Sequence, residues 1–317
     1  MAITGRPKVS VIGAGHVGST LAMRIAEAAL ADVVLVDIVD GMPQGKALDL
    51  SESRPVVLND VSIVGTNDYA DIAGSDMVIT TAGVPRKPGM SRDDLIEING
   101  KIAVTMAENI KEFAPDAFII QVANPLDAIT YVISEITGTP KNKIMGMAGV
   151  LDSSRYRYFI AEALGVSVKD VQGIVLGGHG DTMVPLPRFT WVGGAPLPEV
   201  MPADQIEAIV ERTRKGGAEI VGLLKTGSAY YAPSAGAFEM AKAIIKDEKR
   251  ILPVAAYLNG EYGISGLFVG VPAVLGKDGI EKIWQLPLSD EELAALKNSA
   301  DHVKALVDKV NELGILG

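Results

Sequence analysis

The sequence contains no cysteine and has more acidic than basic residues. Across 317 residues, the absence of cysteine excludes disulfides, thiol nucleophiles and cysteine-ligated metal sites, and we expect no bound metal. The 39 acidic and 29 basic residues argue against a nucleic-acid-binding surface. No uninterrupted apolar run reaches the ~18 residues of a transmembrane helix. We therefore expect a soluble, cytoplasmic protein that binds neither nucleic acid nor membrane.

What the chain does contain is a strand, a glycine turn, a helix and a second strand in immediate succession. The apolar run Val9–Ile12 leads directly into Gly13–Gly18, which has the pattern G-x-G-x-x-G. Residues 19–29 favour a helix, and the apolar residues 33–36 end in Asp37, about 20 residues after the turn. This is the order of elements in a dinucleotide-binding βαβ unit.

Each part of this unit has a chemical task. Gly13 permits the tight turn, Gly15 lets a pyrophosphate approach the backbone, and Gly18 lets the helix pack closely on the sheet. Asp37 accepts hydrogen bonds from the adenosine ribose and repels a 2′-phosphate, so we expect NAD rather than NADP as the cofactor. In a chain with 34 glycines the motif alone also fits a purely structural turn, and only its surroundings favour the nucleotide.

Strand and helix patterns alternate through the first half of the chain and change their order in the second. The alternation predicts an α/β fold with a doubly wound parallel sheet, a Rossmann-type NAD-binding domain, in residues 1–145. Residues 146–317 are expected to form an α+β catalytic domain. The predicted helices span 45–52, 92–113, 128–137, 150–164, 201–224, 234–246 and 290–313, and the predicted strands span 61–64, 76–81, 117–122, 144–147 and 171–176, with a hairpin at Asn259-Gly260.

A basic segment follows one of the predicted strands. Residues 84–92, VPRKPGMSR, hold Arg86, Lys87 and Arg92 among glycine and proline residues. Because ligands bind beyond the carboxyl ends of the strands in parallel sheets, this segment is expected near the nucleotide. We interpret it as a lid that closes over an anion; an ordinary solvated loop has the same composition.

Only three histidines are available for acid–base chemistry. His179 stands out because the glycines of GGHGD leave room for a substrate to reach its ring, although a lone histidine is commonly a structural hydrogen-bonder. Asp152 and Arg155 lie three residues apart at the start of a predicted helix and so share a face. There, Asp152 can hold a histidine N–H and Arg155 can bind a carboxylate; the alternative is a plain surface ion pair.

Six motifs that follow one another along the chain carry a resemblance to a known family. They are GAGHVG with Asp37, VPRKPGMSR, VANPLD, GVLDSSRYR, GGHGDTMVP and LKTGSAYYAP. Together they resemble the lactate/malate dehydrogenase family, and most of all the lactate-dehydrogenase-like malate dehydrogenases of prokaryotes. The resemblance implies reversible hydride transfer between (S)-malate and NAD, giving oxaloacetate and NADH, as in the tricarboxylic acid cycle. It also implies a homo-oligomer, with a tetramer favoured over a dimer.

The resemblance further implies roles for individual residues. His179 is the expected general acid/base, with Asp152 orienting its ring, while Arg92 on the lid polarises the substrate carbonyl. Arg155 binds the carboxylate next to the reacting carbon, and Asn124 hydrogen-bonds the substrate oxygen, ahead of an expected cis bond to the following proline. The cofactor-binding residues implied are Gly13, Ala14, Gly15, His16, Val17, Gly18, Asp37, Asn99, Val122, Ala123 and Asn124.

Substrate choice falls to the lid residue Arg86, a position that is arginine in the family's malate enzymes and typically glutamine in its lactate enzymes. Oxaloacetate carries a second carboxylate, and Arg86 supplies a partner for an anion that is costly to bury alone. Ala229 matches a position that is commonly threonine in lactate enzymes, and its small side chain leaves room for the larger substrate.

Three alternatives stay open beside a malate dehydrogenase. The nearest is an L-lactate dehydrogenase. A second is a non-catalytic NAD-binding protein, against which the intact Asp152, Arg155, His179 and Arg92 argue. The third is an NAD- and metal-dependent glycoside hydrolase, whose metal site normally needs the cysteine that this chain lacks.

Overall fold

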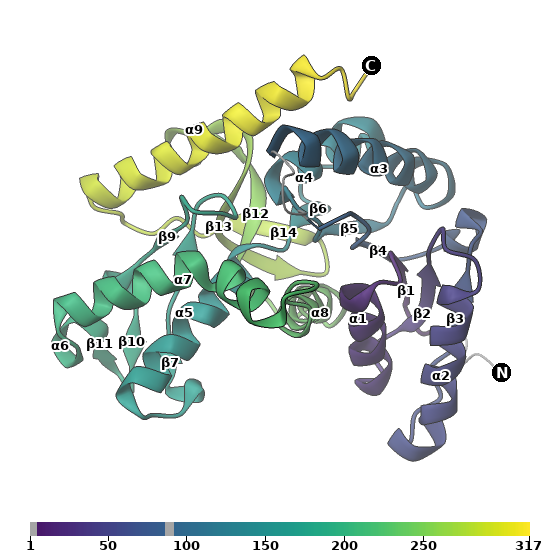
Figure 1. The fold of residues 1–317 in the computed structure, drawn as a ribbon, viewed down its shortest axis with the longest axis horizontal. Coiled ribbons are helices and arrows are strands. Elements are labelled where there is room, and N and C mark those ends of the chain that lie inside the picture. Colours follow the sequence, from purple (N-terminus) through teal and green to yellow (C-terminus); the bar gives the residue numbers. More distant parts are fainter. Residues whose placement is uncertain (1–4, 86–91) are drawn as a thin grey trace.

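The computed structural model describes residues 5–85 and 92–317. Their central element is a nine-stranded sheet (Figure 1). Its parallel strands are β1 (Lys8–Ile12), β2 (Asp32–Val36), β3 (Ile63–Thr66), β4 (Met77–Thr80), β5 (Phe118–Gln121) and β6 (Ile144–Gly146). They lie in the order β3-β2-β1-β4-β5-β6. This is the strand order of a doubly wound dinucleotide-binding sheet, and the predicted fold class is confirmed.

Three antiparallel strands from the second half of the chain extend the same sheet. They are β12 (Arg250–Asn259), β13 (Ser265–Gly276) and β14 (Gly279–Ile283). The hairpin of β12 and β13 turns at the predicted Asn259-Gly260, and β12 pairs with β6 through Ala255 and Gly146. The sheet therefore crosses the boundary expected between residues 145 and 146, and this division into domains stays a prediction.

Helices cover both faces of the sheet, as alternation of strand and helix predicts. One face holds α1 (His16–Glu27) and α8 (Tyr231–Ile245); the other holds α3 (Arg92–Phe113), α4 (Leu126–Thr137) and α9 (Asp290–Glu312) (Figure 1). Alternate residues of β2 point to opposite faces: Val33 and Leu35 join one core, and Val34 and Val36 join the other. The sheet is buried on both sides, which explains its nearly continuous apolar strands.

A third core lies beside the sheet, where α5 (Gly149–Leu164), α6 (Leu197–Val200) and α7 (Ala203–Leu224) pack on short strands. The single strand predicted over 171–176 is wrong. The structure has two short strands there, β7 (Val171–Gln172) and β8 (Val175–Leu176), which pair with different partners, β10 (Trp191–Val192) and β9 (Val184–Pro185); the last short strand is β11 (Ala195–Pro196). A short apolar run does not reveal that the chain bends between two buried pairs.

Several helix ends follow local signals. The predicted capping box starts α9, because Ser289 Oγ accepts from Glu292 N–H and the Glu292 carboxylate accepts from Ser289 N–H. The helix α2 (Met42–Val57) is longer than the predicted 45–52 and includes Pro55 in its last turn, where few helical bonds remain to be lost. Among the described residues, no helix combines the length and the apolar stretch needed to cross a bilayer.

Candidate active site

The glycine turn joins β1 to α1 at close quarters. Gly13 has φ +105°, and a Cβ there would lie 2.6 Å from the backbone nitrogen of Ala82. A Cβ on Gly18 would lie 1.8 Å from the carbonyl oxygen of Gly13, whereas a Cβ on Gly15 would meet nothing within 4 Å. The turn thus needs two of its glycines for its own packing and leaves space at Gly15, beside the N-terminus of α1, for an anionic ligand.

This contrast predicts different effects for two alanine substitutions. Gly18→Ala should lower the free energy of unfolding by about 1–3 kcal/mol, because the new methyl group overlaps the turn. Gly15→Ala should leave stability nearly unchanged but weaken NADH binding roughly tenfold or more, because the methyl group fills the space of the pyrophosphate. Thermal denaturation without ligand and fluorescence titration with NADH separate the two effects; equal losses of stability would contradict this account.

Asp37 lies just beyond β2, next to the turn. Its Oδ2 accepts a hydrogen bond from Ala14 N–H at 2.7 Å, and its Oδ1 accepts one from Val39 N–H at 3.0 Å. Asp37 also lines a cavity of about 400 Å³ whose other walls include Met42 and Tyr69. A largely apolar cavity with one carboxylate at its edge suits an adenine ring and its ribose.

A second cavity, of about 320 Å³, shares Gly15 with the first. Asn99 lies in its wall and is held there by the backbone, since its Oδ1 accepts from Val84 N–H at 2.8 Å and its Nδ2 donates to the carbonyl of Asn124 at 2.6 Å. The other predicted residues in this wall are His16, Val17, Val122, Ala123, Asn124, His179 and Ala229. The two cavities form a two-part groove that fits the two halves of a dinucleotide.

Two further contacts shape the surroundings of the second cavity. The peptide bond between Asn124 and Pro125 is cis, as the resemblance implies. The ring of Tyr230 stacks on His16 with 4.9 Å between ring centroids, so the segment before α8 contacts the glycine turn. Sequence reasoning missed Tyr230, because no local pattern shows that it meets a residue so distant in the chain.

His179 and Asp152 form a buried hydrogen-bonded pair. His179 Nδ1 lies 2.8 Å from Asp152 Oδ2, and Arg155 Nη1 donates to Oδ1 of the same carboxylate at 3.3 Å. Asp152 is 2% exposed and the Arg155 side chain 13%, so this is not an ion pair on the surface of a helix. Burial lowers the pKa of His179, but the charge and hydrogen bond of Asp152 oppose it, and the net pKa is raised.

The two sides of this pair come from different parts of the chain. Asp152 lies in the first turn of α5, directly after β6. His179 follows β8, and its segment is fixed to the sheet because Gly177 exchanges two backbone hydrogen bonds with Gly270 of β13, at 2.8 and 3.1 Å. A Cβ on Gly270 would lie 2.3 Å from the carbonyl oxygen of Gly177, which explains the glycine there.

Two polar residues without a predicted role hold the backbone of the His179 segment. Ser299 of α9 accepts a hydrogen bond from Gly178 N–H at 2.9 Å, and Asp127 of α4 accepts one from His179 N–H at 2.9 Å. Asp127 belongs to the VANPLD motif, but the motif does not show what the carboxylate contacts. These contacts join the site to the helices on one face of the sheet.

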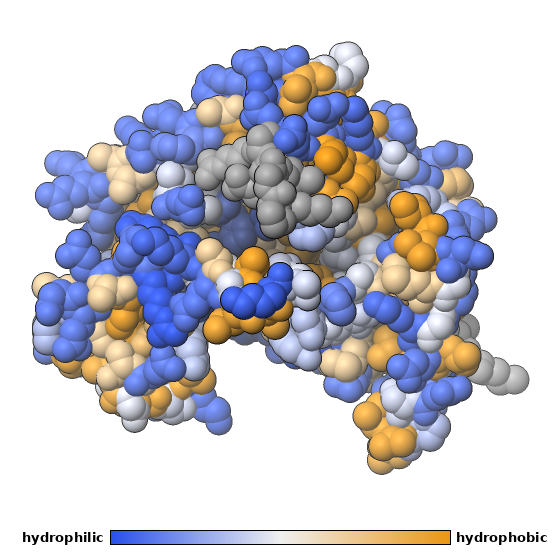
Figure 2. Space-filling view, viewed as in Figure 1, coloured by the Kyte–Doolittle hydropathy of each residue, from blue (hydrophilic) through white to orange (hydrophobic). Residues whose placement is uncertain are grey.

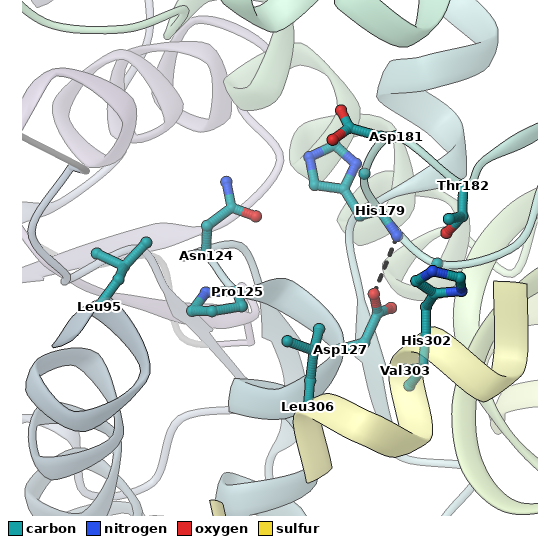
Figure 3. Close-up of a pocket in the computed structure, with 12 residues that line it drawn as sticks. Leu95, Asn124, Pro125, Asp127, His179, Asp181, Thr182, His302, Val303 and Leu306 are labelled. Carbon is teal, nitrogen blue, oxygen red and sulfur yellow. Dashed lines mark hydrogen bonds between the residues drawn. The ribbon is translucent and has the colours of Figure 1, made fainter. Parts of the chain in front are cut away.

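Of the predicted lid, residues 84–92, the structure describes only the first two residues and the backbone of the last. Arg86 lies outside the residues that the structure describes, and Arg92 is the first residue of α3, with its side chain likewise outside the description. Leu95, one turn further, lines a third cavity of about 300 Å³ together with His179 (Figure 3). His302 of α9 is exposed and also lines this cavity. The start of α3 is therefore close to His179.

Comparisons with known proteins agree with this arrangement. A family model for the NAD-binding domain of lactate/malate dehydrogenases matches residues 7–146, and a model for the α/β C-terminal domain of the same family matches residues 149–313. Malate dehydrogenase from Roseiflexus castenholzii is 55% identical over 308 residues, which cover 97% of this chain and 100% of that protein.

Solved structures of both kinds of enzyme are also similar. Malate dehydrogenase from Salinibacter ruber superposes with a TM-score of 0.93 at 54% identity, covering 96% of this chain and 98% of that one. A lactate dehydrogenase from Cryptosporidium parvum, solved with lactic acid and nicotinamide adenine dinucleotide, has a TM-score of 0.94 at 43% identity, covering 98% and 99%. The chain belongs to the lactate/malate dehydrogenase family.

Proposed function

We propose that this chain is an NAD-dependent malate dehydrogenase, which interconverts (S)-malate and oxaloacetate. The observation that carries the proposal is the buried pair of Asp152 and His179, with Arg155 on the same carboxylate. His179 lies in the wall of the second cavity. Relatives that are 55% identical over most of the chain and bear the name malate dehydrogenase support this choice of substrate.

The residues present fit NAD and the chemistry of a hydroxy acid. In malate oxidation, His179 accepts the hydroxyl proton at Nε2, because its Nδ1 is hydrogen-bonded to Asp152. The Asp152 carboxylate stabilises the imidazolium that forms, and Arg155 binds the substrate carboxylate. We assign Arg92 and Asn124 to the oxygen that becomes the carbonyl. Bound NAD would supply the acceptor for the hydride that leaves the carbon carrying this oxygen.

The choice between malate and lactate rests on Arg86, with Ala229 in the wall of the second cavity leaving space for a second carboxylate. Arg86→Gln should lower the ratio of kcat/KM for oxaloacetate to that for pyruvate at least about tenfold, since leaving a buried charge unpaired costs ~3 kcal/mol or more. Steady-state NADH oxidation with each substrate measures the ratio. A ratio equal to that of the wild type would reject the role of Arg86.

The experiment that tests the function is NADH oxidation by the purified protein with oxaloacetate and, separately, with pyruvate. A large preference for oxaloacetate supports the proposal. A preference for pyruvate would keep the family and the chemistry of His179 but replace malate by lactate. No turnover with either substrate would favour a non-catalytic NAD-binding protein.

We further propose that the protein acts in the cytoplasm, in the tricarboxylic acid cycle, as a homo-oligomer, with a tetramer favoured over a dimer. Large apolar side chains at the end of α2 and in α7 are exposed: 82% for Val56, 86% for Leu58 and 76% for Leu223. Figure 2 shows apolar residues gathered at the lower end of α2. Subunit contacts would remove such surfaces from water. Sedimentation equilibrium measures the number of subunits, and a monomer at micromolar concentration would contradict the proposal.

A further inference from the structure

Asp127 is a buried carboxylate that the reaction described above does not use. It lies in the first turn of α4, is 3% exposed, and lines the third cavity next to His179 (Figure 3). Its Oδ2 accepts the hydrogen bond from His179 N–H, while its Oδ1 has no hydrogen-bond partner among the described residues. A buried carboxylate with one unpaired oxygen is costly, so its presence calls for an explanation.

Two carboxylates therefore flank His179 from two different helices. Asp152 of α5 bonds the imidazole ring, and Asp127 of α4 bonds the main chain of the same residue, as the dashed line in Figure 3 marks. The helices α4 and α5 follow β5 and β6, which are neighbouring parallel strands. Both carboxylates therefore lie beyond the carboxyl ends of neighbouring parallel strands, where each one bonds His179.

The residues that the structure describes place few charged groups around Asp127. Burial raises the pKa of Asp127 to about 6. The hydrogen bond from the His179 backbone and the charge of the His179 ring act in the opposite direction. For His179, burial lowers the pKa, the Asp152 and then the Asp127 carboxylate raise it, and Arg155 lowers it. Within the described part of the chain, the charged or titratable groups around Asp127 come from α5, from the segment after β8 and from α9: Asp152, Arg155, His179, Asp181 and His302.

We propose that Asp127 is a positioning residue for the dehydrogenase reaction: its carboxylate fixes the main chain of His179 and supplies a second negative charge that favours the protonated ring. This inference rests on the proposed role of His179 as the acid–base group. The Asp127 carboxylate is among the groups that raise the pKa of His179, after the charge and the hydrogen bond of Asp152.

The test separates the charge of Asp127 from its hydrogen bond. Asp127→Asn keeps an oxygen that accepts from His179 N–H and removes the charge. The chain has only three histidines, so NMR of protein labelled with ¹⁵N-histidine follows each ring in turn. We expect the pKa of His179 to fall by about one pH unit, the effect of one poorly screened charge nearby.

The same shift should appear in the kinetics in both directions. Oxaloacetate reduction needs the protonated ring, so the upper pH limit of its kcat/KM should move down by about one unit. Malate oxidation needs the neutral ring, so its lower pH limit should move down by the same amount. The NMR titration does not depend on turnover. A shifted pKa without malate dehydrogenase activity would therefore reject the proposed function while keeping the effect of Asp127.

Two matched variants serve as controls. Asp181→Asn removes the same charge from the same cavity, but Asp181 is exposed, so the pKa of His179 should change by less than about 0.3 units. Ser299→Ala removes the anchor of Gly178 and no charge, so kcat should fall while the pKa of His179 stays in place. An Asp127→Asn protein that loses activity with an unchanged pKa of His179 would overturn the proposal and leave Asp127 a purely structural anchor.

A measurement on the wild-type protein covers the case in which Asp127→Asn does not fold. The NMR titration curve of His179 should depart from a single transition, because the pKa of Asp127 is raised to about 6 and its titration is coupled to that of His179. A curve for His179 that fits a single-proton transition between pH 4 and pH 9 would overturn the electrostatic role of Asp127.

Discussion

His179→Asn should lower kcat for oxaloacetate reduction by about 10³-fold or more, within the range ascribed to general acid–base catalysis. The asparagine amide neither gives up nor takes up a proton near neutral pH, so the substrate oxygen loses its proton donor. The Asp152 carboxylate keeps Arg155 as a partner, so the site should hold its shape. NADH binding should stay within about twofold, because the glycine turn and Asp37 are untouched.

The measurement is single-turnover NADH oxidation beside a fluorescence titration with NADH. His302→Asn is the matched control: it removes an exposed histidine of the third cavity and should keep kcat within about twofold of the wild type. Turnover that survives in His179→Asn at a tenth of the wild-type rate would reject His179 as the acid–base group.

Asp152→Asn should lower kcat for oxaloacetate reduction by about 100-fold or more. The carboxylate is the largest influence that raises the pKa of His179, so its loss leaves burial to lower that pKa. Reduction requires the protonated ring, and the upper pH limit of kcat/KM should therefore move to lower pH. The asparagine amide can also donate a hydrogen bond to Nδ1, which places the proton of the neutral ring on Nε2. In this tautomer Nε2 cannot accept the hydroxyl proton in malate oxidation.

The pH dependence of kcat/KM in both directions checks this prediction. The shift in Asp152→Asn should exceed that in Asp127→Asn, because Asp152 both bonds the ring and carries the charge. A loss of activity that is equal at every pH would mean that Asp152 only orients His179.

Much of the fold could be predicted from the sequence because its signals are local. The strand β1, the glycine turn and α1 are adjacent in the chain, and each has its own composition or spacing. The helix α3 spans the predicted 92–113, and α9 starts at a capping box that four consecutive residues define. Asp152 and Arg155 are three residues apart, so their shared face follows from helix geometry alone.

The rest depends on contacts between distant residues. No local pattern shows that β12 pairs with β6, since antiparallel hairpins look the same whether they form a separate sheet or extend another. The bend that separates β7 from β8 depends on which strands lie beside them. Asp127 and Ser299 hold the His179 segment across 52 and 121 residues of chain, distances over which sequence spacing carries no information.

The pairing of β6 with β12 affects whether the two halves of this enzyme can be expressed as separate fragments. The strand β6 has β5 on one side and β12 on the other, although β12 begins more than 100 residues later in the chain. A fragment that ends after residue 146 would expose the N–H and C=O groups along one side of β6, and such an open edge is a template for aggregation. The nucleotide-binding half is thus a poor candidate for expression alone. Cofactor affinity and catalysis are better separated in the intact chain, by single substitutions, than by truncation.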